Sequence, residues 1–288
     1  RGLGDVYKRQ FLGGLATNAT VSESGTQNIF TSGIASGASI SMGGIQNVSG
    51  GSASLTLISS GGIQNISSGG LATGTTISSG GNALVFASGI TSNATLVGGT
   101  QTISGGIAQG TTVSNGGIAN ISSGGIARAT TIGSGGIENI FLSGLASGAV
   151  ILNSGIQNIS SGGLASATAI SSGGVQYISS GGSEIAAMIS SGGSQYVLST
   201  GFASGATLIG GSQTISSGGT ANATIISNGG NQIVNGGANI ASASLLSGGT
   251  QTLLSGASVT STTVNSGAVQ SVGSTCLLYT SDAADDMQ

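Results

Sequence analysis

The chain has 288 residues, of which only four are Lys or Arg and seven are Asp or Glu, and it contains no His, Pro or Trp. With so few cations it cannot build a basic surface for nucleic acid or anionic lipid. Without His and with a single Cys it can form neither a zinc site nor a nucleophilic triad, and no apolar run reaches the ~18 residues of a transmembrane helix.

The two terminal segments of the chain can be encoded by the same DNA element, read in opposite orientations. Residues 5–10 (DVYKRQ) can be encoded by a DNA element whose reverse complement, read in a shifted frame, encodes residues 276–281 (CLLYTS). This element resembles the mosaic end of a transposase library adapter. We therefore assign residues 1–10 and 276–288 to adapter-derived, non-native segments, and residues 11–275 to an internal fragment of a larger protein.

Residues 11–275 form a repeat array with a period of about nineteen residues. A first apolar column is aliphatic throughout: Ile29, Val48, Ile66, Val85, Ile103, Ile121, Ile140, Ile159, Ile178, Val197, Ile215, Val234, Leu253 and Val272. So is a second: Val21, Ile40, Ile58, Ile77, Leu96, Val113, Ile132, Ile151, Ile170, Ile189, Leu208, Ile226, Leu245 and Val264. Such a period predicts a solenoid in which each repeat forms one coil stacked on the last.

Each repeat is predicted to contain short strands between glycine turns. In residues 62–81 two arms, of about eight and eleven residues, are separated by Ser-Ser-Gly-Gly, whose glycines can adopt positive φ. Asn18 and Asn93 occupy the slot of Gly74, as expected if that corner is left-handed. No window holds a helical period, and about nineteen residues are too few for a helix-containing repeat. The sequence thus predicts an all-β fold, a right-handed single-stranded parallel β-helix of about 14 coils.

One residue type dominates the slot two before the first apolar column. Its members are Gln27, Gln46, Gln64, Gln101, Gln157, Gln176, Gln195, Gln213, Gln232, Gln251 and Gln270, with Ala83, Ala119 and Glu138 as exceptions. Because strand side chains alternate, this slot shares a face with the buried Ile residues. We interpret it as a structural ladder of stacked amides that fixes the register of the coils.

The next slot should point to solvent. It supplies a candidate self-association face made of Asn28, Asn47, Asn65, Asn120, Asn139, Asn158, Tyr177 and Tyr196. The two tyrosines would stack in neighbouring coils, either as a small contact patch or through strand propensity alone. A third column is almost uniformly Ala, from Ala16 to Ala221, and its small size suggests close backbone packing at a corner.

Catalytic chemistry is scarce in residues 11–275. The only acids there are Glu23, Glu138 and Glu184, and Glu138 stands in the Gln column while Glu184 stands in the Ala column. Their offset within a coil is not fixed by the period, so a carboxylate pair at ~10 Å stays open. The segment contains no Asp, which excludes a calcium-binding β-roll. We predict no enzymatic activity, no catalytic residues, no cofactor and no metal site.

The repeats resemble the passenger repeats of AIDA-type autotransporter adhesins. The motifs that carry the resemblance are GGIQNISSGG at residues 61–70 and SSGGLASATAISSGG at residues 160–174, and the pattern covers residues 11–275. The resemblance implies a β-helix on the Gram-negative cell surface, delivered by type V secretion and anchored by an outer-membrane barrel that lies outside the fragment. It also implies self-association or adherence, with heptose on Ser or Thr in some members.

These features lead to a hypothesis with two alternatives. The first is a non-enzymatic surface adhesin and stalk whose polar ladders bind other copies or a host or bacterial surface, leading to autoaggregation and biofilm formation. The second is a passive spacer that carries a distal adhesive domain. A carbohydrate-active β-helix enzyme is the third, but it predicts acid-bearing loop insertions that the repeats lack. Neither nucleic-acid binding nor membrane insertion of this fragment is expected.

Overall fold

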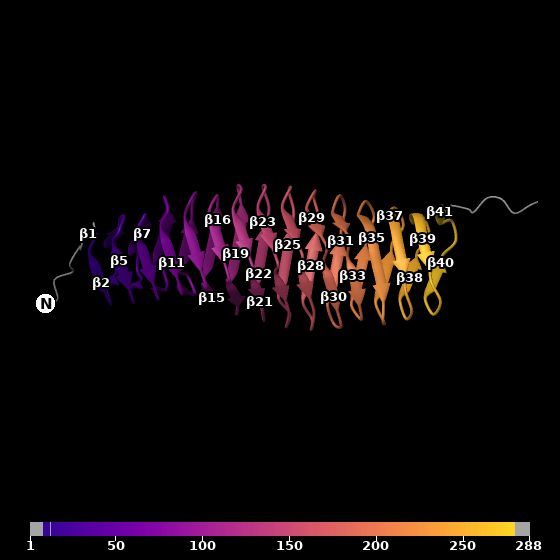
Figure 1. The fold of residues 1–288 in the computed structure, drawn as a ribbon, viewed down its shortest axis with the longest axis horizontal. Coiled ribbons are helices and arrows are strands. Elements are labelled where there is room, and N and C mark those ends of the chain that lie inside the picture. Colours follow the sequence, from indigo (N-terminus) through magenta and orange to yellow (C-terminus); the bar gives the residue numbers. More distant parts are fainter. Residues whose placement is uncertain (1–7, 12, 280–288) are drawn as a thin grey trace, which may run out of the picture.

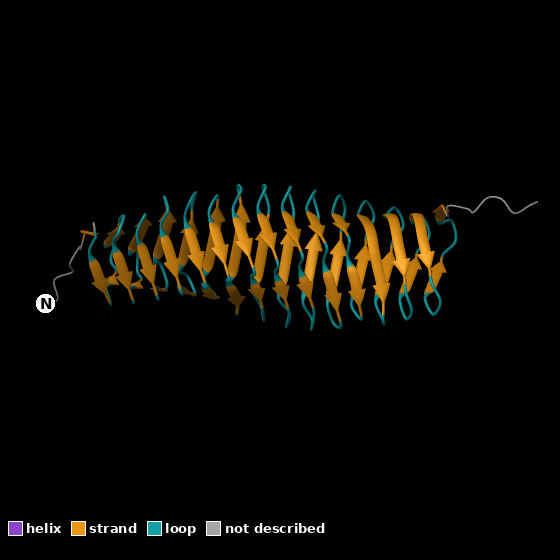
Figure 2. Ribbon diagram, in the orientation of Figure 1, coloured by secondary structure: helices purple, strands orange, loops and turns teal. Residues whose placement is uncertain are grey.

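The computed structural model describes residues 8–11 and 13–279 and shows a rod of stacked coils that advances steadily from the N-terminal to the C-terminal end (Figure 1). Every regular element in these two ranges is a strand (Figure 2). The coils number about 14 and are about 19 residues apart, which confirms the predicted parallel solenoid. No helix in the described ranges is long and apolar enough to cross a bilayer.

One strand from each coil forms a 15-stranded parallel sheet, here called sheet A. Its strands are β1 (Lys8–Phe11), β4 (Thr26–Ile29), β7 (Ile45–Ser49), β10 (Ile63–Ser67), β13 (Asn82–Val85), β16 (Thr100–Ser104), β19 (Ile118–Ser122), β22 (Ile137–Ile140), β25 (Ile156–Ile159), β28 (Val175–Ile178), β31 (Ser194–Val197), β34 (Ser212–Ile215), β36 (Asn231–Val234), β38 (Thr250–Leu253) and β40 (Val269–Val272). Equivalent residues pair from coil to coil, as in Ile63 with Ile45 and Gln64 with Gln46.

The longer arm of each coil bends once and contributes to sheet B. Before the bend lie β2 (Leu15–Thr17), β5 (Ile34–Ser36), β8 (Ser52–Ser54), β11 (Leu71–Thr73), β14 (Ile90–Ser92), β17 (Ile107–Gln109), β20 (Ile126–Arg128), β23 (Leu145–Ser147), β26 (Leu164–Ser166), β29 (Ser183–Ile185) and β32 (Phe202–Ser204). After it lie β3 (Thr20–Val21), β6 (Ser39–Ile40), β9 (Leu57–Ile58), β12 (Thr76–Ser78), β15 (Thr95–Val97), β18 (Thr112–Ser114), β21 (Thr131–Ile132), β24 (Val150–Ile151), β27 (Ala169–Ile170), β30 (Met188–Ser190) and β33 (Thr207–Ile209).

Towards the C-terminal end the bend no longer interrupts the strand. There β35 (Thr220–Ser227), β37 (Asn239–Leu245) and β39 (Ser258–Val264) run across it, and β41 (Leu277–Tyr279) pairs with the start of β39. Strands β1 and β41 extend the coil stack beyond the predicted limits of residues 11 and 275, into segments assigned to adapter DNA. The remaining parts of those segments, residues 1–7 and 280–288, lie outside the described residues.

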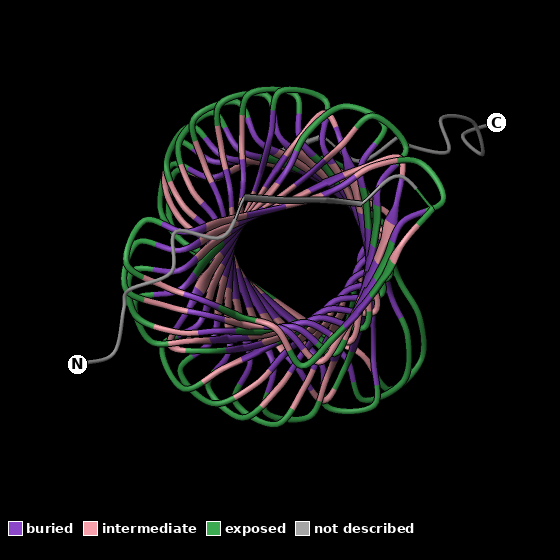
Figure 3. Cartoon of the chain, turned by 90° about the vertical axis from the view of Figure 1, so that its left-hand side faces the viewer, coloured by how far each residue is buried: buried purple, intermediate pink, exposed green. Residues whose placement is uncertain are grey.

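The core is the interior of the coil. Seen along the axis, buried residues line the inside of the ring and the exposed turns project outward (Figure 3). Both apolar columns are buried there, from Val21 through Leu253. Their last members, Val264 and Val272, are exceptions with exposed fractions of 46% and 50%, because no described strand stacks on their far side.

The bend is a left-handed corner, as predicted from its Gly and Asn residues. Gly74 has a φ of 66°, and Asn18 and Asn93 have φ values of 50° and 53°. Leu55 occupies the same slot at φ 52°, although a branched side chain is costly in this conformation. Backbone bonds from coil to coil hold the corner, since the Leu55 N–H donates to the Thr73 carbonyl at 2.9 Å.

The two glycines of each Ser-Ser-Gly-Gly turn serve different purposes. Gly69 has a φ of 80°, and the turn closes through a bond from the Gly70 N–H to the Ser67 carbonyl at 2.8 Å. Gly70 is required by close approach instead, because a Cβ built there would lie 2.2 Å from the carbonyl oxygen of Val48 in the preceding coil. The prediction that positive φ explains these glycines holds for the first of the pair and is wrong for the second.

We therefore expect Gly70→Ala to lower the free energy of unfolding by about 1–3 kcal/mol through steric overlap with the Val48 carbonyl. Gly69→Asn is the matched control, since Asn tolerates positive φ and a Cβ at Gly69 meets nothing within 4 Å. Thermal melts followed by circular dichroism should show a clear loss for the first variant and little change for the second. Equal melting temperatures for both variants would contradict the close-approach explanation.

Candidate self-association face and buried polar ladder

The solvent face of sheet A carries the predicted amide column in two runs. Asn28, Asn47 and Asn65 are joined by side-chain bonds of 2.8 Å, each amide Nδ2 donating to the Oδ1 of the preceding coil. Asn120, Asn139 and Asn158 form a second run with bonds of 2.9 Å. Leu84 and Thr102 stand between the two runs in the same column. The amides satisfy one another along the rod and remain partly accessible.

Tyr177 and Tyr196 continue the second run. Asn158 pairs with Tyr177, and Tyr177 pairs with Tyr196, in the register of β25, β28 and β31. The two rings stack with centroids 5.2 Å apart and planes inclined by 17°, as the sequence predicted. Five consecutive coils therefore present an uninterrupted row of three amides and two aromatic rings.

An aliphatic column that sequence reasoning missed runs beside this row. It consists of the first outward residue of each strand, namely Ile118, Ile137, Ile156 and Val175, each partly exposed. The signal was present in the sequence, because these residues follow directly after the Gly-Gly pairs and precede the amide slot by two positions. The candidate face is thus a double row in which apolar contact and amide bonding lie side by side without a charge.

The Gln side chains point into the core on the opposite side of the same strands. Where two glutamines are neighbours in register, the Nε2 of the later one donates to the Oε1 of the earlier one at 2.6–2.7 Å, as Gln46 does to Gln27 and Gln64 does to Gln46. From Gln157 to Gln270 the pattern is continuous over seven glutamines. Apart from Gln270, which is only partly buried, these side chains are almost completely removed from water.

The Ala column does not lie at a corner, contrary to the prediction. Ala72 sits in the middle of β11, buried and facing the interior. This side of sheet B lies across the core from the Gln ladder, because Glu184 in the Ala column accepts a bond from Gln176 at 2.7 Å. Small residues are needed there because each opposing Gln must fit inside the coil.

Wherever the Gln ladder is interrupted, the side chain in the next coil has no Gln oxygen to which it could donate a hydrogen bond. Ala83 leaves no acceptor for the following Gln101, whose Nε2 donates instead to the hydroxyl of Thr91 at 3.1 Å, where Thr replaces the usual Ala. Ala119 leaves no acceptor for the next coil, and that coil carries Glu138, which has no amide to satisfy. Glu138 then accepts from Gln157 at 2.7 Å and begins the longest run.

The two core acids are closed off from solvent. Glu138 is fully buried and Glu184 is 1% exposed, so neither can reach a substrate at the surface. Burial raises the pKa of Glu138, and the bond from Gln157 opposes this. Burial likewise raises the pKa of Glu184 to about 7, against the lowering effect of bonds from Thr168 and Gln176. The described residues contain no group of three His, Cys, Asp or Glu side chains that could hold a metal ion.

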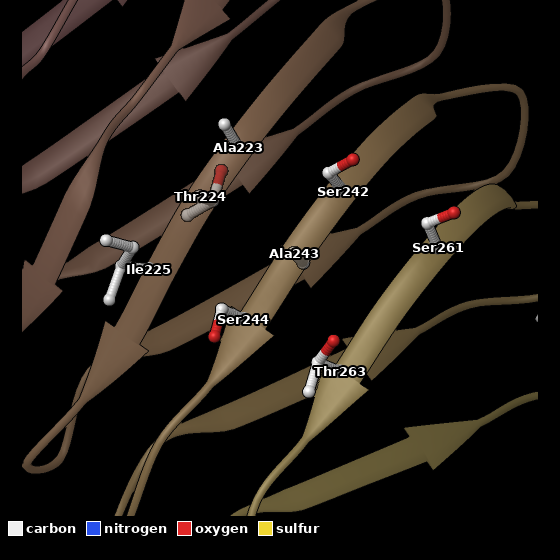
Figure 4. A pocket seen from close by; sticks show the side chains of 8 residues that line it. All are labelled: Ala223, Thr224, Ile225, Ser242, Ala243, Ser244, Ser261 and Thr263. Atoms are coloured by element: carbon white, nitrogen blue, oxygen red, sulfur yellow. The ribbon is translucent and has the colours of Figure 1, made fainter.

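A shallow groove of about 370 Å³ crosses the uninterrupted strands β35, β37 and β39 (Figure 4). Its lining consists of Ala223, Thr224, Ile225, Ser242, Ala243, Ser244, Ser261 and Thr263. It presents hydroxyl groups and the aliphatic side chains of Ile225 and two alanines, and no ionisable group. The groove therefore supplies no general acid or base.

Comparison with known proteins adds a structural relative. No family model matches the chain, and no curated protein matches it at a significant level. Among solved structures it is similar to the crystal structure of the TibC-catalysed hyper-glycosylated TibA55–350 fragment, with a TM-score of 0.89 and 35% sequence identity. The match covers 92% of this chain and 99% of that one. TibA is an autotransporter adhesin, and the matched fragment belongs to its passenger.

The amide ladder predicts how Glu138 can be replaced. Glu138→Gln places an amide Nε2 opposite Ala119, in the position of the unpaired Oε1, and a buried donor without an acceptor costs about 1–3 kcal/mol relative to a paired one. The double variant Ala119→Gln with Glu138→Gln restores an unbroken ladder from Gln101 and should recover that stability. Chemical denaturation measures both variants. A double variant as unstable as the single one would show that the missing acceptor is not the cause.

Proposed function

Because the chain belongs to the autotransporter adhesin passengers, we propose that it is a bacterial surface stalk whose sheet A face binds other copies side by side. TibA, the structural relative, is a passenger and is itself acted on by TibC, which fits a non-enzymatic role. The passenger class is extracellular. Anchoring through an outer-membrane barrel and type V secretion remain predictions for this chain.

The uncharged double row on sheet A is the observation that supports this proposal. Between residues 13 and 276 the exposed charged side chains are Glu23 and Arg128, and neither lies on the sheet A strands β19, β22, β25, β28 and β31. Two rods can therefore approach along this face with little repulsion. Each coil contributes a weak contact, and the repetition of the same contact over several coils multiplies the effect. In cells, such association would appear as autoaggregation and biofilm growth.

Two substitutions to Lys test which face of the rod mediates self-association. We expect Asn120→Lys with Asn158→Lys to abolish clumping of beads coated with the chain, since like charges would meet when two faces align. Ser166→Lys with Ser204→Lys is the control, because these residues point outward on β26 and β32 of sheet B and add the same charge. Clumping of the sheet A variant should return in part at high salt, where charges are screened.

The results also separate the alternatives. Equal loss of clumping in both variants would indicate a general charge effect rather than a specific face. Beads that never clump with the unmodified chain would favour the passive spacer, for which adhesion depends only on the reach of the rod. Binding of a host or other bacterial surface would then require a domain outside this segment.

O-linked sugars are a further part of the proposal. The TibA fragment is hyper-glycosylated by TibC, and this chain presents outward hydroxyls in register, among them Thr76, Thr95, Thr112 and Thr131. We expect a TibC-type transferase to add several sugar units, which intact-mass measurement would detect as evenly spaced increments. An unchanged mass in the presence of active transferase would contradict this part and leave the association proposal standing.

A further inference from the structure

Two buried glutamates in the middle of the rod are connected by glutamine amides. The Nε2 of Gln157 donates to Glu138 Oε2 at 2.7 Å. The Nε2 of Gln176 donates both to Gln157 Oε1 and to Glu184 Oε2, each at 2.7 Å. Glu138 on β22 and Glu184 on β29 are thus joined by one path of hydrogen bonds inside the core, and the Gln ladder continues from Gln176 to Gln195.

Glu184 sits where the repeat pattern places Ala. Its register neighbours are Ala165 in β26 and Ala203 in β32. Thr168 surrounds its carboxyl group with two further donors, the hydroxyl at 3.0 Å from Oε2 and the backbone N–H at 3.4 Å from Oε1. These donors stabilise the ionised form of Glu184 and so oppose the effect of burial, which raises its pKa.

The carboxyl group of Glu138 has fewer hydrogen-bond partners than that of Glu184. Its Oε2 accepts the bond from Gln157, but its Oε1 is buried without a hydrogen-bond partner. A carboxylate with an unpaired oxygen in the core favours the protonated form. The two acids are therefore unequal, since Glu184 accepts three hydrogen bonds and Glu138 accepts one from Gln157 and has an unpaired oxygen.

In residues 13–279, no cation lies beside either acid. Arg128, at the end of β20, is exposed on the outer side, and Glu23 is exposed near the N-terminal end of the rod. Tyr177 on β28 points to the outer face of sheet A. The other described side chains on β19, β22, β25, β26, β27, β29 and β30 are not ionisable. Two negative charges without a counter-ion repel each other and are costly in a core, so the network must take up or release protons as the pH changes.

We propose that Glu138, Gln157, Gln176 and Glu184, with Thr168, form a proton-linked switch that locks the coils between β22 and β29 in mildly acid solution and loosens them when Glu184 ionises. The same strands carry Asn139, Asn158 and Tyr177 on their outer side, so the switch lies directly beneath the second run of amides and rings. The inference concerns the stability of these coils and does not require self-association.

The direction of the pH effect follows from proton binding. Burial raises the pKa of Glu138, and burial raises that of Glu184 from 4.5 to about 7, while the bonds from Thr168 and Gln176 oppose this rise and the charge of Glu138 adds to it. Between those values the folded chain binds more protons than the unfolded chain. Stability should therefore be complete in acid solution and should fall as the pH rises towards 7.

Carboxyl-labelled glutamate gives a direct test, because the full chain contains only Glu23, Glu138 and Glu184. We expect three carboxyl carbon signals, of which one titrates near neutrality and a second stays protonated above the normal range of glutamate. The signal that disappears in Glu184→Ala should be the one that titrates near neutrality. Two core signals that both titrate near 4.5 would overturn the proposal even if the rod still self-associates.

Amide hydrogen exchange tests the consequence for the coils. After correction for intrinsic exchange rates, opening of β22, β25 and β28 should rise more than tenfold between pH 5 and pH 8, since one pKa unit corresponds to a factor of ten. Strands β7 and β10, far from the acids, serve as the internal reference and should show no such rise.

Glu184→Ala is the matched variant, because it restores the Ala column and leaves Gln176 bonded to Gln157. It should remove most of the pH dependence, and its combination with Ala119→Gln and Glu138→Gln should remove the rest. A pH slope that survives in the triple variant, or a flat profile in the unmodified chain, would overturn the proposal. If the variants do not fold, the carboxyl titration of the unmodified chain still decides.

Discussion

The structure depends on the pairing of each residue with its equivalent in the next coil. Ile63 lies on Ile45 and Gln64 on Gln46, and the same holds along both sheets. Because strand side chains alternate, a slip by one residue would move every Ile of the column to the outside and every Asn to the inside. The matching of like residues is therefore what makes a rod of very short strands possible, since a single coil buries too little surface to fold alone.

The sequence contained most of the information about the axis of the rod and much less about its cross-section. The two apolar columns, the left-handed corner at Asn18 and Asn93 and the stacking of Tyr177 on Tyr196 followed from the period and from known residue preferences. The position of the Ala column did not follow from the period or from residue preferences. Whether Ala72 lies at a corner or in mid-strand depends on how the longer arm bends, and the period does not encode that bend.

Other features depended on contacts between coils that the sequence does not display. The need for Gly at position 70 arises from a carbonyl oxygen in the preceding coil, which only the stacked backbone brings near. The hydrogen bond from Gln101 to Thr91 joins two columns that face each other across the core, and the period of the sequence does not show which columns face each other. For the candidate face, the amides and tyrosines were found from the sequence, whereas the adjacent row from Ile118 to Val175 was overlooked because its members resemble core residues.

The interruptions of the Gln ladder affect how strongly neighbouring coils are held together. The backbone is continuous from coil to coil, but the amide chain is divided into one block from Gln27 to Gln64, the isolated Gln101 and one block from Glu138 to Gln270. In the described ranges, side-chain amide bonds cross neither the interface between β10 and β13, where Ala83 follows Gln64, nor that between β16 and β19, where Ala119 follows Gln101, so backbone bonding and aliphatic stacking act there alone. We expect a rod under tension to separate first at these two interfaces, because the neighbouring coils on either side are also held together by side-chain amides.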